Sequence, residues 1–129
     1  IPDLNVYDNV AFVLRVTNQP KNTIRHRVPY VLNLVKLVER AKAYPDTLSG
    51  GEKQRVAIAR GFASDPKLII ADEPTANIDP ALSYDIVKLL KEINKCGTTV
   101  IMVTHEHSLV EYFGGRIVSL KNVEVIFDE

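Results

Sequence analysis

Ser49, Gly50 and Gly51 form the first segment whose residue types could bind a phosphate. They stand directly before an amphipathic stretch, and the free backbone N–H groups and positive dipole end of a helix start favour an anion. Glycines also let the main chain approach a phosphate without interference from a Cβ atom. Taken alone, the segment fits equally well a serine N-cap with glycines beside it. It therefore predicts a helix start and leaves two interpretations open.

Two adjacent carboxylates, Asp72 and Glu73, follow the continuous apolar run 68–71. Such a run predicts a strand of a parallel sheet covered on both faces. Ligands of open α/β proteins bind outside the carboxyl ends of these strands. One carboxylate there suits Mg²⁺, which prefers oxygen ligands, and the other can orient a water for attack. The alternative is a solvated turn after the strand.

His105 comes directly after a second strand-like run, residues 98–103. The carboxyl ends of neighbouring parallel strands meet at one edge of a sheet, so His105 is expected beside Asp72 and Glu73. A lone histidine at such a position is more often a surface residue than a reacting one. The other two histidines of the chain are interpreted as surface residues.

Helical periodicity runs through residues 1–63 and predicts the elements that carry the first segment. Asn5 is expected to cap a helix, and Ser49 is expected to cap another. Between them a further helical pattern is interrupted by Pro29. That proline predicts either a kink or a helix that starts only near Val28.

From residue 65 onward the pattern changes to strand, helix, strand. Asp79 reads as an N-cap followed by Pro80 at the first helical position, and Gly97 ends the helix. This βαβ unit predicts two parallel strands with a right-handed crossover. The remaining elements expected here are a short helix over 108–112 and a hairpin of 116–120 with 123–127, turning at Lys121-Asn122.

Composition limits the classes of function. The chain has 129 residues, 16 basic and 16 acidic, with a net charge of +0, so charge gives no support for a nucleic-acid partner or an anionic membrane surface. The single cysteine, Cys96, excludes an internal disulfide and fits a reducing compartment. The apolar runs are too short to span a bilayer, and the N-terminus lacks the layout of a signal peptide. Because the chain begins at Ile1-Pro2 without methionine, we expect a fragment of a longer protein.

The order and spacing of the segments are more specific than any one of them. Together they resemble the second half of an ABC-transporter nucleotide-binding domain, over essentially the whole chain. The resemblance implies an α/β fold of the P-loop NTPase type, with a parallel sheet core and an α-helical subdomain. It implies a helical subdomain over 1–64, ending in the signature helix, and a catalytic half-core over 65–129. The segments that carry it are Leu48-Ser49-Gly50-Gly51-Glu52, Asp72-Glu73, Asn77-Ile78-Asp79 and Thr104-His105.

The resemblance assigns roles in binding and hydrolysing ATP with Mg²⁺. The signature motif, which in this family contacts the γ-phosphate of ATP held by a second copy, corresponds to Leu48, Ser49, Gly50, Gly51 and Glu52. The other implied roles are Asp72 as the Mg²⁺ ligand of the Walker B strand, Glu73 as general base, Asp79 as the D-loop aspartate and His105 as the switch histidine.

The chain departs from the family pattern in two ways. Ala76 stands where relatives usually carry glycine, Glu106 replaces the common aspartate after the histidine, and Lys36 occupies a position that is often glycine. These changes are mild. The larger departure is that the sequence contains no G-x-x-x-x-G-K-[ST] loop. In the family this loop, the adenine-stacking aromatic and the Q-loop glutamine all precede the region that the chain matches. We therefore expect the chain alone to be inactive and unable to bind ATP.

Within the family, the sequence around the motifs is similar to that of the cell-division ATPases. The lipoprotein-release and macrolide-export ATPases are close relatives of these. This implies two partners, a second copy and an integral-membrane permease, and no nucleic acid. It also implies a cytoplasmic protein held at the inner face of the plasma membrane through the permease. The alternatives are the ATPase of a lipoprotein-release or macrolide-export system, and a non-catalytic docking module of such a subunit. A chromosome-maintenance ATPase of the SMC or Rad50 type is set aside, since no heptad-repeat arm precedes Leu48.

Overall fold

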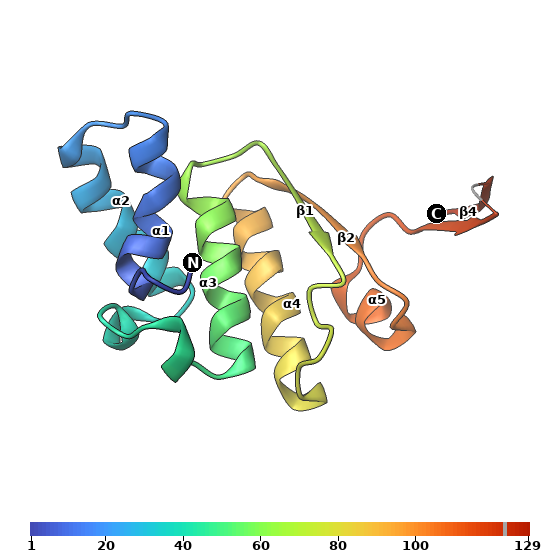
Figure 1. The fold of residues 1–129 in the computed structure, drawn as a ribbon. Coiled ribbons are helices and arrows are strands. Elements are labelled where there is room, and N and C mark those ends of the chain that lie inside the picture. The colour runs from blue at the N-terminus through green and yellow to red at the C-terminus, as the bar shows by residue number, and fades with distance from the viewer. Residues whose placement is uncertain (123) are drawn as a thin grey trace.

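The computed structural model of the protein describes residues 1–122 and 124–129. Helices α1 to α4 lie side by side, a two-stranded sheet follows, and a second pair of strands projects away from the rest (Figure 1). In chain order the elements are α1 (Val6–Val16), α2 (Lys21–Leu34), the 3₁₀ turns η1 (Val38–Arg40) and η2 (Pro45–Thr47), α3 (Gly50–Ala63), β1 (Leu68–Asp72), α4 (Pro80–Lys95), β2 (Thr99–Val103), α5 (His107–Phe113), β3 (Val118–Lys121) and β4 (Glu124–Asp128).

The first two helices begin as their sequences dictate, with one correction. The Asn5 side chain accepts a hydrogen bond from the backbone N–H of Asp8 at 2.8 Å, so the predicted cap of α1 is confirmed. Of the two alternatives predicted at Pro29, the helix that starts only near Val28 is wrong, because α2 begins at Lys21 and continues through Pro29. Proline removes one hydrogen bond, but burial of the helix face on either side of it holds the helix together.

One hydrophobic core joins the helices to the sheet. Side chains from α1, α2 and α3 fill it, and it continues onto the inner face of α4 and the covered face of the strands through Ile69 and Val100. Burial of apolar surface of this extent is the main source of stability in such a helical cluster. The largest fully buried side chains of the described chain are Phe62, Leu37, Ile86, Leu90, Ile93 and Leu109.

The β1–α4–β2 unit has the predicted parallel arrangement. β1 pairs with β2 in register, so that Asp72 lies opposite Val103 at the carboxyl end of both strands. The connecting helix starts at Pro80 behind the N-cap Asp79, and Gly97 follows its end with φ +101°. The N-cap, the proline at the first position and the terminating glycine are all confirmed.

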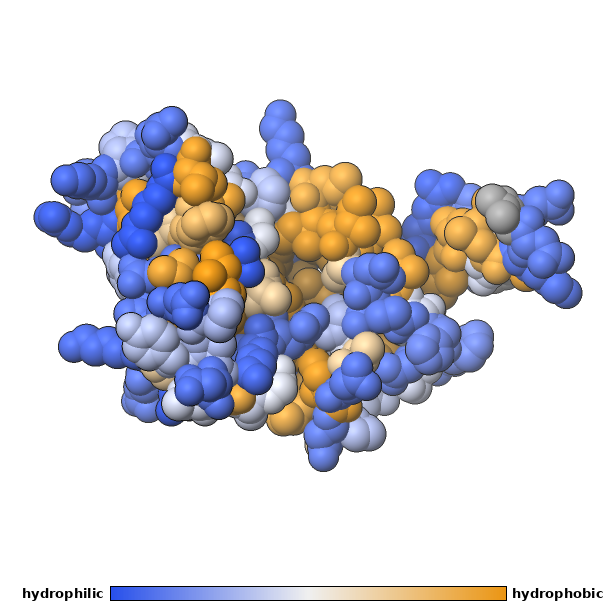
Figure 2. Space-filling view, viewed as in Figure 1, coloured by the Kyte–Doolittle hydropathy of each residue, from blue (hydrophilic) through white to orange (hydrophobic). Residues whose placement is uncertain are grey.

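The sheet is covered on one face only. The apolar runs predicted strands covered on both faces, but α4 covers one face and no described element packs on the other. Figure 2 shows the resulting apolar area over the two strands. Its side chains are 47% to 64% exposed and belong to Leu68, Ile70, Ile101 and Val103.

The C-terminal strands form the predicted hairpin. β3 and β4 are antiparallel, with an irregularity between Ser119 and Leu120, and Asn122 takes a positive φ of 51° at the turn. The turn uses asparagine where glycine is commoner, because asparagine tolerates this conformation. Val123, predicted in the second strand, lies outside the described residues. No helix in the described part of the chain is long and apolar enough to cross a bilayer.

Candidate functional site

The start of α3 is fixed by a reciprocal capping box. Ser49 Oγ accepts a hydrogen bond from the Glu52 backbone N–H at 3.2 Å, and the Ser49 backbone N–H donates to Glu52 Oε2 at 2.9 Å. Arg40 lies 3.4 Å from the other carboxylate oxygen of Glu52 and donates to the Thr47 carbonyl at 2.9 Å. The serine hydroxyl keeps its own proton to donate. The predicted cap is therefore present, and it leaves one hydroxyl donor available at the helix start.

The two glycines of this segment have different surroundings. A Cβ atom built at Gly50 would meet nothing within 4 Å, whereas one at Gly51 would lie 3.4 Å from Leu82 Cδ1. No neighbour within the described chain therefore requires glycine at position 50. Its backbone is open to a group that approaches from outside. The preceding Leu48 is buried in the core and anchors the segment instead of facing solvent.

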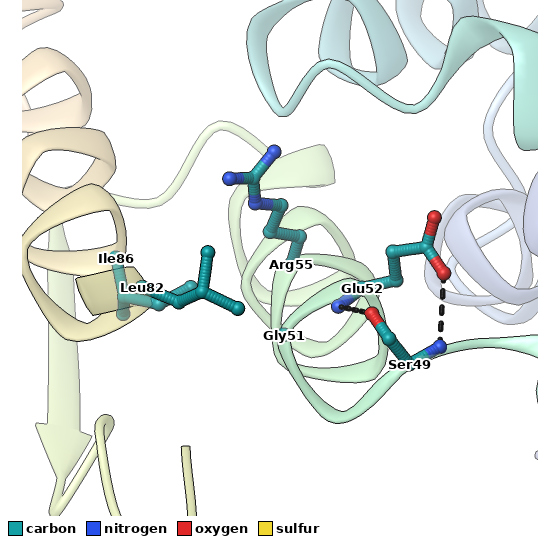
Figure 3. Close-up of a pocket in the computed structure, with 6 residues that line it drawn as sticks. All are labelled: Ser49, Gly51, Glu52, Arg55, Leu82 and Ile86. Carbon is teal, nitrogen blue, oxygen red and sulfur yellow. Dashed lines mark hydrogen bonds between the residues drawn. The ribbon is translucent and has the colours of Figure 1, made fainter. Parts of the chain in front are cut away.

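A shallow pocket lies between the first turns of α3 and the start of α4 (Figure 3). Its volume is about 150 Å³. Pockets that enclose a ligand of nucleotide size occupy roughly 300–1,000 Å³, so this end of the chain does not surround a nucleotide by itself. Arg55 lies at the pocket, 3.8 Å from Asp85 of α4. The residues that line it are Ser49, Gly51, Glu52, Arg55, Leu82 and Ile86.

Glu73 and His105 meet at the carboxyl ends of β1 and β2. The Glu73 backbone N–H donates to the Val103 carbonyl at 2.8 Å and extends the strand pairing by one residue. Glu73 then takes a positive φ of 45°, an uncommon conformation for a residue other than glycine. Its Oε1 lies 2.8 Å from His105 Nδ1. The predicted proximity of these two side chains is confirmed.

The two oxygens of the Glu73 carboxylate differ in their surroundings. Oε1 bonds to His105, whereas Oε2 is screened from solvent and has no hydrogen-bond partner among residues 1–122 and 124–129. The hydrogen bond from His105 to Glu73, and then the Glu73 charge, raise the pKa of His105 above its ordinary value; Glu106 adds to this. The imidazole is 84% exposed, so its second nitrogen faces outward. The pair holds one oriented carboxylate oxygen and one ring nitrogen open to a ligand.

Asp72 directly precedes Glu73, and Asp79 follows Glu73 at the end of the loop that leads to α4. Asp72 is the exposed last residue of β1, while Asp79 Oδ1 accepts from the Ala81 backbone N–H at 2.8 Å and caps α4. No group of three histidine, cysteine or acidic side chains able to hold a metal occurs in the described part of the chain. Mg²⁺ is commonly held by one or two carboxylates together with phosphate oxygens. Asp72 fits that role when the phosphates supply the remaining oxygens.

Sequence reasoning missed one contact beside the site. The Thr75 hydroxyl donates to Glu106 Oε1 at 2.9 Å, across 31 residues of sequence. In the sequence, Glu106 stands out only as a departure from the usual aspartate. Their positions, two residues after Glu73 and one after His105, were the only available signal.

The residues predicted from the sequence fall into two separate groups. Glu73 and His105 are brought together beside Asp72, whereas the Ser49 segment starts α3 and borders α4. Within the described residues, no hydrogen bond or ion pair joins one group to the other. The chain thus presents two incomplete sites on different elements.

Comparison with known proteins identifies the family. The sequence profile of the ABC transporter family matches residues 1–76. The chain belongs to the ABC transporter family. It is 45% identical to the cell division ATP-binding protein FtsE of Bacillus subtilis over all 129 residues, and 50% identical to FtsE of Mycobacterium tuberculosis over 124 residues, which is 96% of this chain. The methionine import ATP-binding protein MetN of Haemophilus ducreyi is 46% identical over 122 residues, 94% of this chain.

The chain corresponds to one part of these ABC proteins. It covers 57% of the Bacillus FtsE, 54% of the Mycobacterium FtsE and 36% of the Haemophilus MetN. The solved structure of the ATP-binding cassette MJ0796, a dimer in a post-hydrolysis state bound to ADP and Pi, aligns with a TM-score of 0.82 and 38% identity, covering 100% of this chain and 57% of that one. The fold is therefore that of an ABC ATPase, mixed α/β with a parallel sheet.

Proposed function

We propose that this chain forms the signature and Walker B part of the ATP-hydrolysing subunit of an ABC membrane complex, with Glu73 as general base. The observation that carries the proposal is the divided Glu73 carboxylate, with Oε1 held by His105 and Oε2 screened and without a partner among the described residues. Because catalytic hydrogen bonds often form only in the substrate-bound complex, this unpartnered oxygen is proposed to be uncovered when ATP binds and then to accept a proton from the attacking water. The fold and family of the chain are those of ATP-binding proteins, which supports ATP as the substrate.

His105 has two functions in this proposal. Through Nδ1 it orients the Glu73 carboxylate, and through its outward nitrogen it can donate to an oxygen of the γ-phosphate. Because its pKa is raised, the ring is more often charged than an ordinary histidine, and a cation stabilises the negative charge that develops in phosphoryl transfer. Asp72 would hold Mg²⁺, which neutralises phosphate charge when bound. Asp79 at the start of α4 is proposed to border the same nucleotide.

The signature segment is proposed to act on ATP held by a second copy. Ser49 and Gly50 are both exposed, and the Ser49 hydroxyl keeps a proton to donate. The pocket beside them is too small for a nucleotide, and the 129 residues contain no phosphate-binding P-loop sequence. The start of α3 can therefore contact a phosphate of ATP only when the nucleotide is bound mainly by another protein surface. The dimeric state of the related MJ0796 with ADP and Pi supports two copies that close face to face.

We favour the proposal that the chain belongs to the cell-division branch of the family. FtsE proteins from three genera are 43–50% identical to the chain, which supports a subunit that drives an FtsX-like permease in cell division. The helical subdomain, residues 1–64, is proposed to contact that permease, and the half-core, residues 65–129, to carry the hydrolysis residues. Contact with the permease would hold the protein at the inner membrane face. MetN proteins at 44–46% identity favour a second candidate, the ATPase of a small-molecule importer.

The proposal is tested by two variants of the full-length gene product, assayed for phosphate release and for sedimentation with saturating Mg·ATP. Glu73→Gln keeps the shape of the side chain but is a far weaker base, so turnover should fall about 10²–10⁴-fold while the ATP-bound dimer persists. Ser49→Arg fills the space at the α3 start, so both the dimer and turnover should be lost.

Two matched controls accompany these variants. Glu92→Gln changes an exposed glutamate of α4 whose ion-pair partner among the described residues is Lys95, and Ser64→Arg places the same arginine at the other end of α3. Both should hydrolyse ATP at about the rate of the unaltered protein. Near-normal turnover of Glu73→Gln, or an ATP-dependent dimer of Ser49→Arg, would contradict the assignment.

A further inference from the structure

The contact between Thr75 and Glu106 joins the two loops that carry the Glu73–His105 pair. Thr75 lies in the loop after β1, two residues beyond Glu73, and Glu106 lies in the loop after β2, one residue beyond His105. The Thr75 hydroxyl donates to Glu106 Oε1 at 2.9 Å. The Glu106 backbone N–H in turn donates to Thr104 Oγ1 at 3.1 Å, which fixes the loop that carries the acceptor.

Burial makes this hydrogen bond costly to lose. Thr75 is 2% exposed, so its hydroxyl has no access to bulk water, and Glu106 is the acceptor that it bonds. A buried donor without a partner carries a desolvation penalty that an exposed donor does not. The loop therefore keeps its conformation most favourably when Thr75 and Glu106 remain bonded.

The loop after β1 also needs support because part of its backbone is strained. Glu73 has φ +45°, which is unfavourable for a glutamate, whereas Asn77 has φ +60°, a conformation that asparagine tolerates; Thr75 lies midway between them. Only two backbone hydrogen bonds lie within the loop, from Ala76 N–H to the Glu73 carbonyl and from Ile78 N–H to the Thr75 carbonyl, at 3.1 and 3.3 Å. Strained conformations persist where surrounding contacts over-determine them. Three described hydrogen bonds link the two loops and hold this conformation. They join the Glu73 N–H to the Val103 carbonyl, Glu73 to His105, and Thr75 to Glu106.

We propose that Glu106 is a positioning residue that acts through Thr75 to hold the strained loop after β1, so that the Glu73 carboxylate faces His105. Glu106 acts in this role as a hydrogen-bond acceptor, and its negative charge is not required. The inference rests on the proposed function, in which Glu73 and His105 act on ATP. It adds that ATP hydrolysis also depends on Thr75 and Glu106, whose side chains bond to each other and not to Glu73 or His105.

Conservative variants separate positioning from general stability. Thr75→Val keeps the shape of the side chain and removes the hydroxyl, whereas Thr75→Ser keeps the hydroxyl. Glu106→Leu removes the acceptor, whereas Glu106→Gln keeps an oxygen that can accept from Thr75. Each is made in the full-length gene product and assayed for kcat and KM of ATP hydrolysis, together with its melting temperature.

Thr75→Val and Glu106→Leu are expected to lower kcat by about tenfold to a hundredfold with KM nearly unchanged, since small misplacements of reacting groups cost that much. Thr75→Ser and Glu106→Gln are expected to retain most of kcat. The double variant Thr75→Val/Glu106→Leu should be no worse than either single variant, because the two residues act as one unit. Amide hydrogen exchange over residues 73–78 should rise in Thr75→Val and stay unchanged in Thr75→Ser.

The outcomes distinguish this inference from the proposed function. If the unaltered protein hydrolyses ATP and Thr75→Val matches it in kcat and exchange, the positioning role is wrong and the proposed function stands. Equal loss in Glu106→Gln and Glu106→Leu would also overturn the role, because it would show that the charge is required. If Glu73→Gln hydrolyses ATP normally, the proposed function fails and the positioning role fails with it.

Discussion

The helical cluster α1–α3 and the sheet β1–β2 differ in how completely this chain buries them. Helix residues such as Val10 and Val31 are fully enclosed by neighbouring helices, whereas Ile70 and Val103 of the sheet lie open on one face. Parallel sheets are found almost only with both faces covered. The helical cluster therefore supplies its own stability within 129 residues, and the sheet depends on a layer that the described chain does not provide.

The residues that stabilise the fold and those proposed to act on ATP also lie in different regions. The fully buried side chains lie mainly on the helices, while the Glu73–His105 pair lies at the end of the half-covered sheet. The Glu73 carboxylate, proposed as general base, and the strained backbone at Glu73 are positioned there by contacts between loops, not by deep burial. Substitutions in the two regions should consequently change different measurements, unfolding free energy in one and catalysis or association in the other.

The largest expected effect compares an isoleucine of the buried core, on α4, with an isoleucine on the open sheet face. Ile93 is 0% exposed in the core and Ile70 is 64% exposed on the open sheet face. Ile93→Ala should cost about 2–5 kcal/mol of unfolding free energy, because it removes apolar contacts and leaves a cavity. Ile70→Ala should change it by about 0.5 kcal/mol or less. Urea unfolding of the chain at low concentration, followed by circular dichroism, measures both, and similar costs would mean that the sheet face is covered.

A smaller effect is expected where α2 caps the end of α3. Arg27 donates to the Phe62 and Ala63 carbonyls at 3.0 Å each, and its guanidinium lies 4.8 Å from the centre of the Phe62 ring. These contacts satisfy the last carbonyls of α3 with a cation. Arg27→Ala should therefore cost about 1.5–3 kcal/mol, the usual range for hydrogen bonds to a charged group.

Arg25, exposed on the same helix, provides the control for this prediction. Arg25→Ala should stay within about 0.5 kcal/mol of the unaltered chain. Equal destabilisation by the two alanine variants in the same urea titration would argue against the capping role of Arg27.

The sequence predicted the parts of this molecule that depend on local chemistry. Caps at Asn5, Ser49 and Asp79 follow from short-range hydrogen bonds, and the parallel strands follow from their apolar runs. Of the two alternatives at Pro29, a kink or a helix that starts near Val28, the second is wrong because packing of the buried helix face outweighs the proline. The contact of Thr75 with Glu106 was missed because it joins residues far apart in sequence through a side-chain bond that no periodicity reports.

A third effect concerns association more than stability. Ile70 lies opposite Ile101 on the open face of the sheet, and an exposed apolar patch beside free strand edges favours self-association. Replacing them together by Ile70→Lys and Ile101→Glu places opposite charges across the two strands, which is favourable. Light scattering of the 129-residue chain should show oligomers for the unaltered sequence and mainly monomer for this variant.

The control for the third effect lies on the projecting hairpin. Leu120→Lys changes a residue that is also exposed but belongs to β3, so it should leave the oligomers in place. Dispersal of the oligomers by Leu120→Lys alone would move the associating surface from the sheet to the hairpin.

The smallest effect expected is a pH dependence at the end of the sheet. Glu73, by its hydrogen bond and its charge, raises the pKa of His105 above the ordinary value of 6.5, with Glu106 adding to it. A raised folded-state pKa means that protonated His105 stabilises the fold fully below its unfolded pKa, and this stabilisation is lost as pH rises through the folded pKa. Because the ring is 84% exposed, solvent and salt should keep the effect small. An NMR titration of His105 should give a midpoint above 6.5 that falls in Glu73→Gln, because the amide cannot replace the charge; a midpoint that does not move would contradict the pairing.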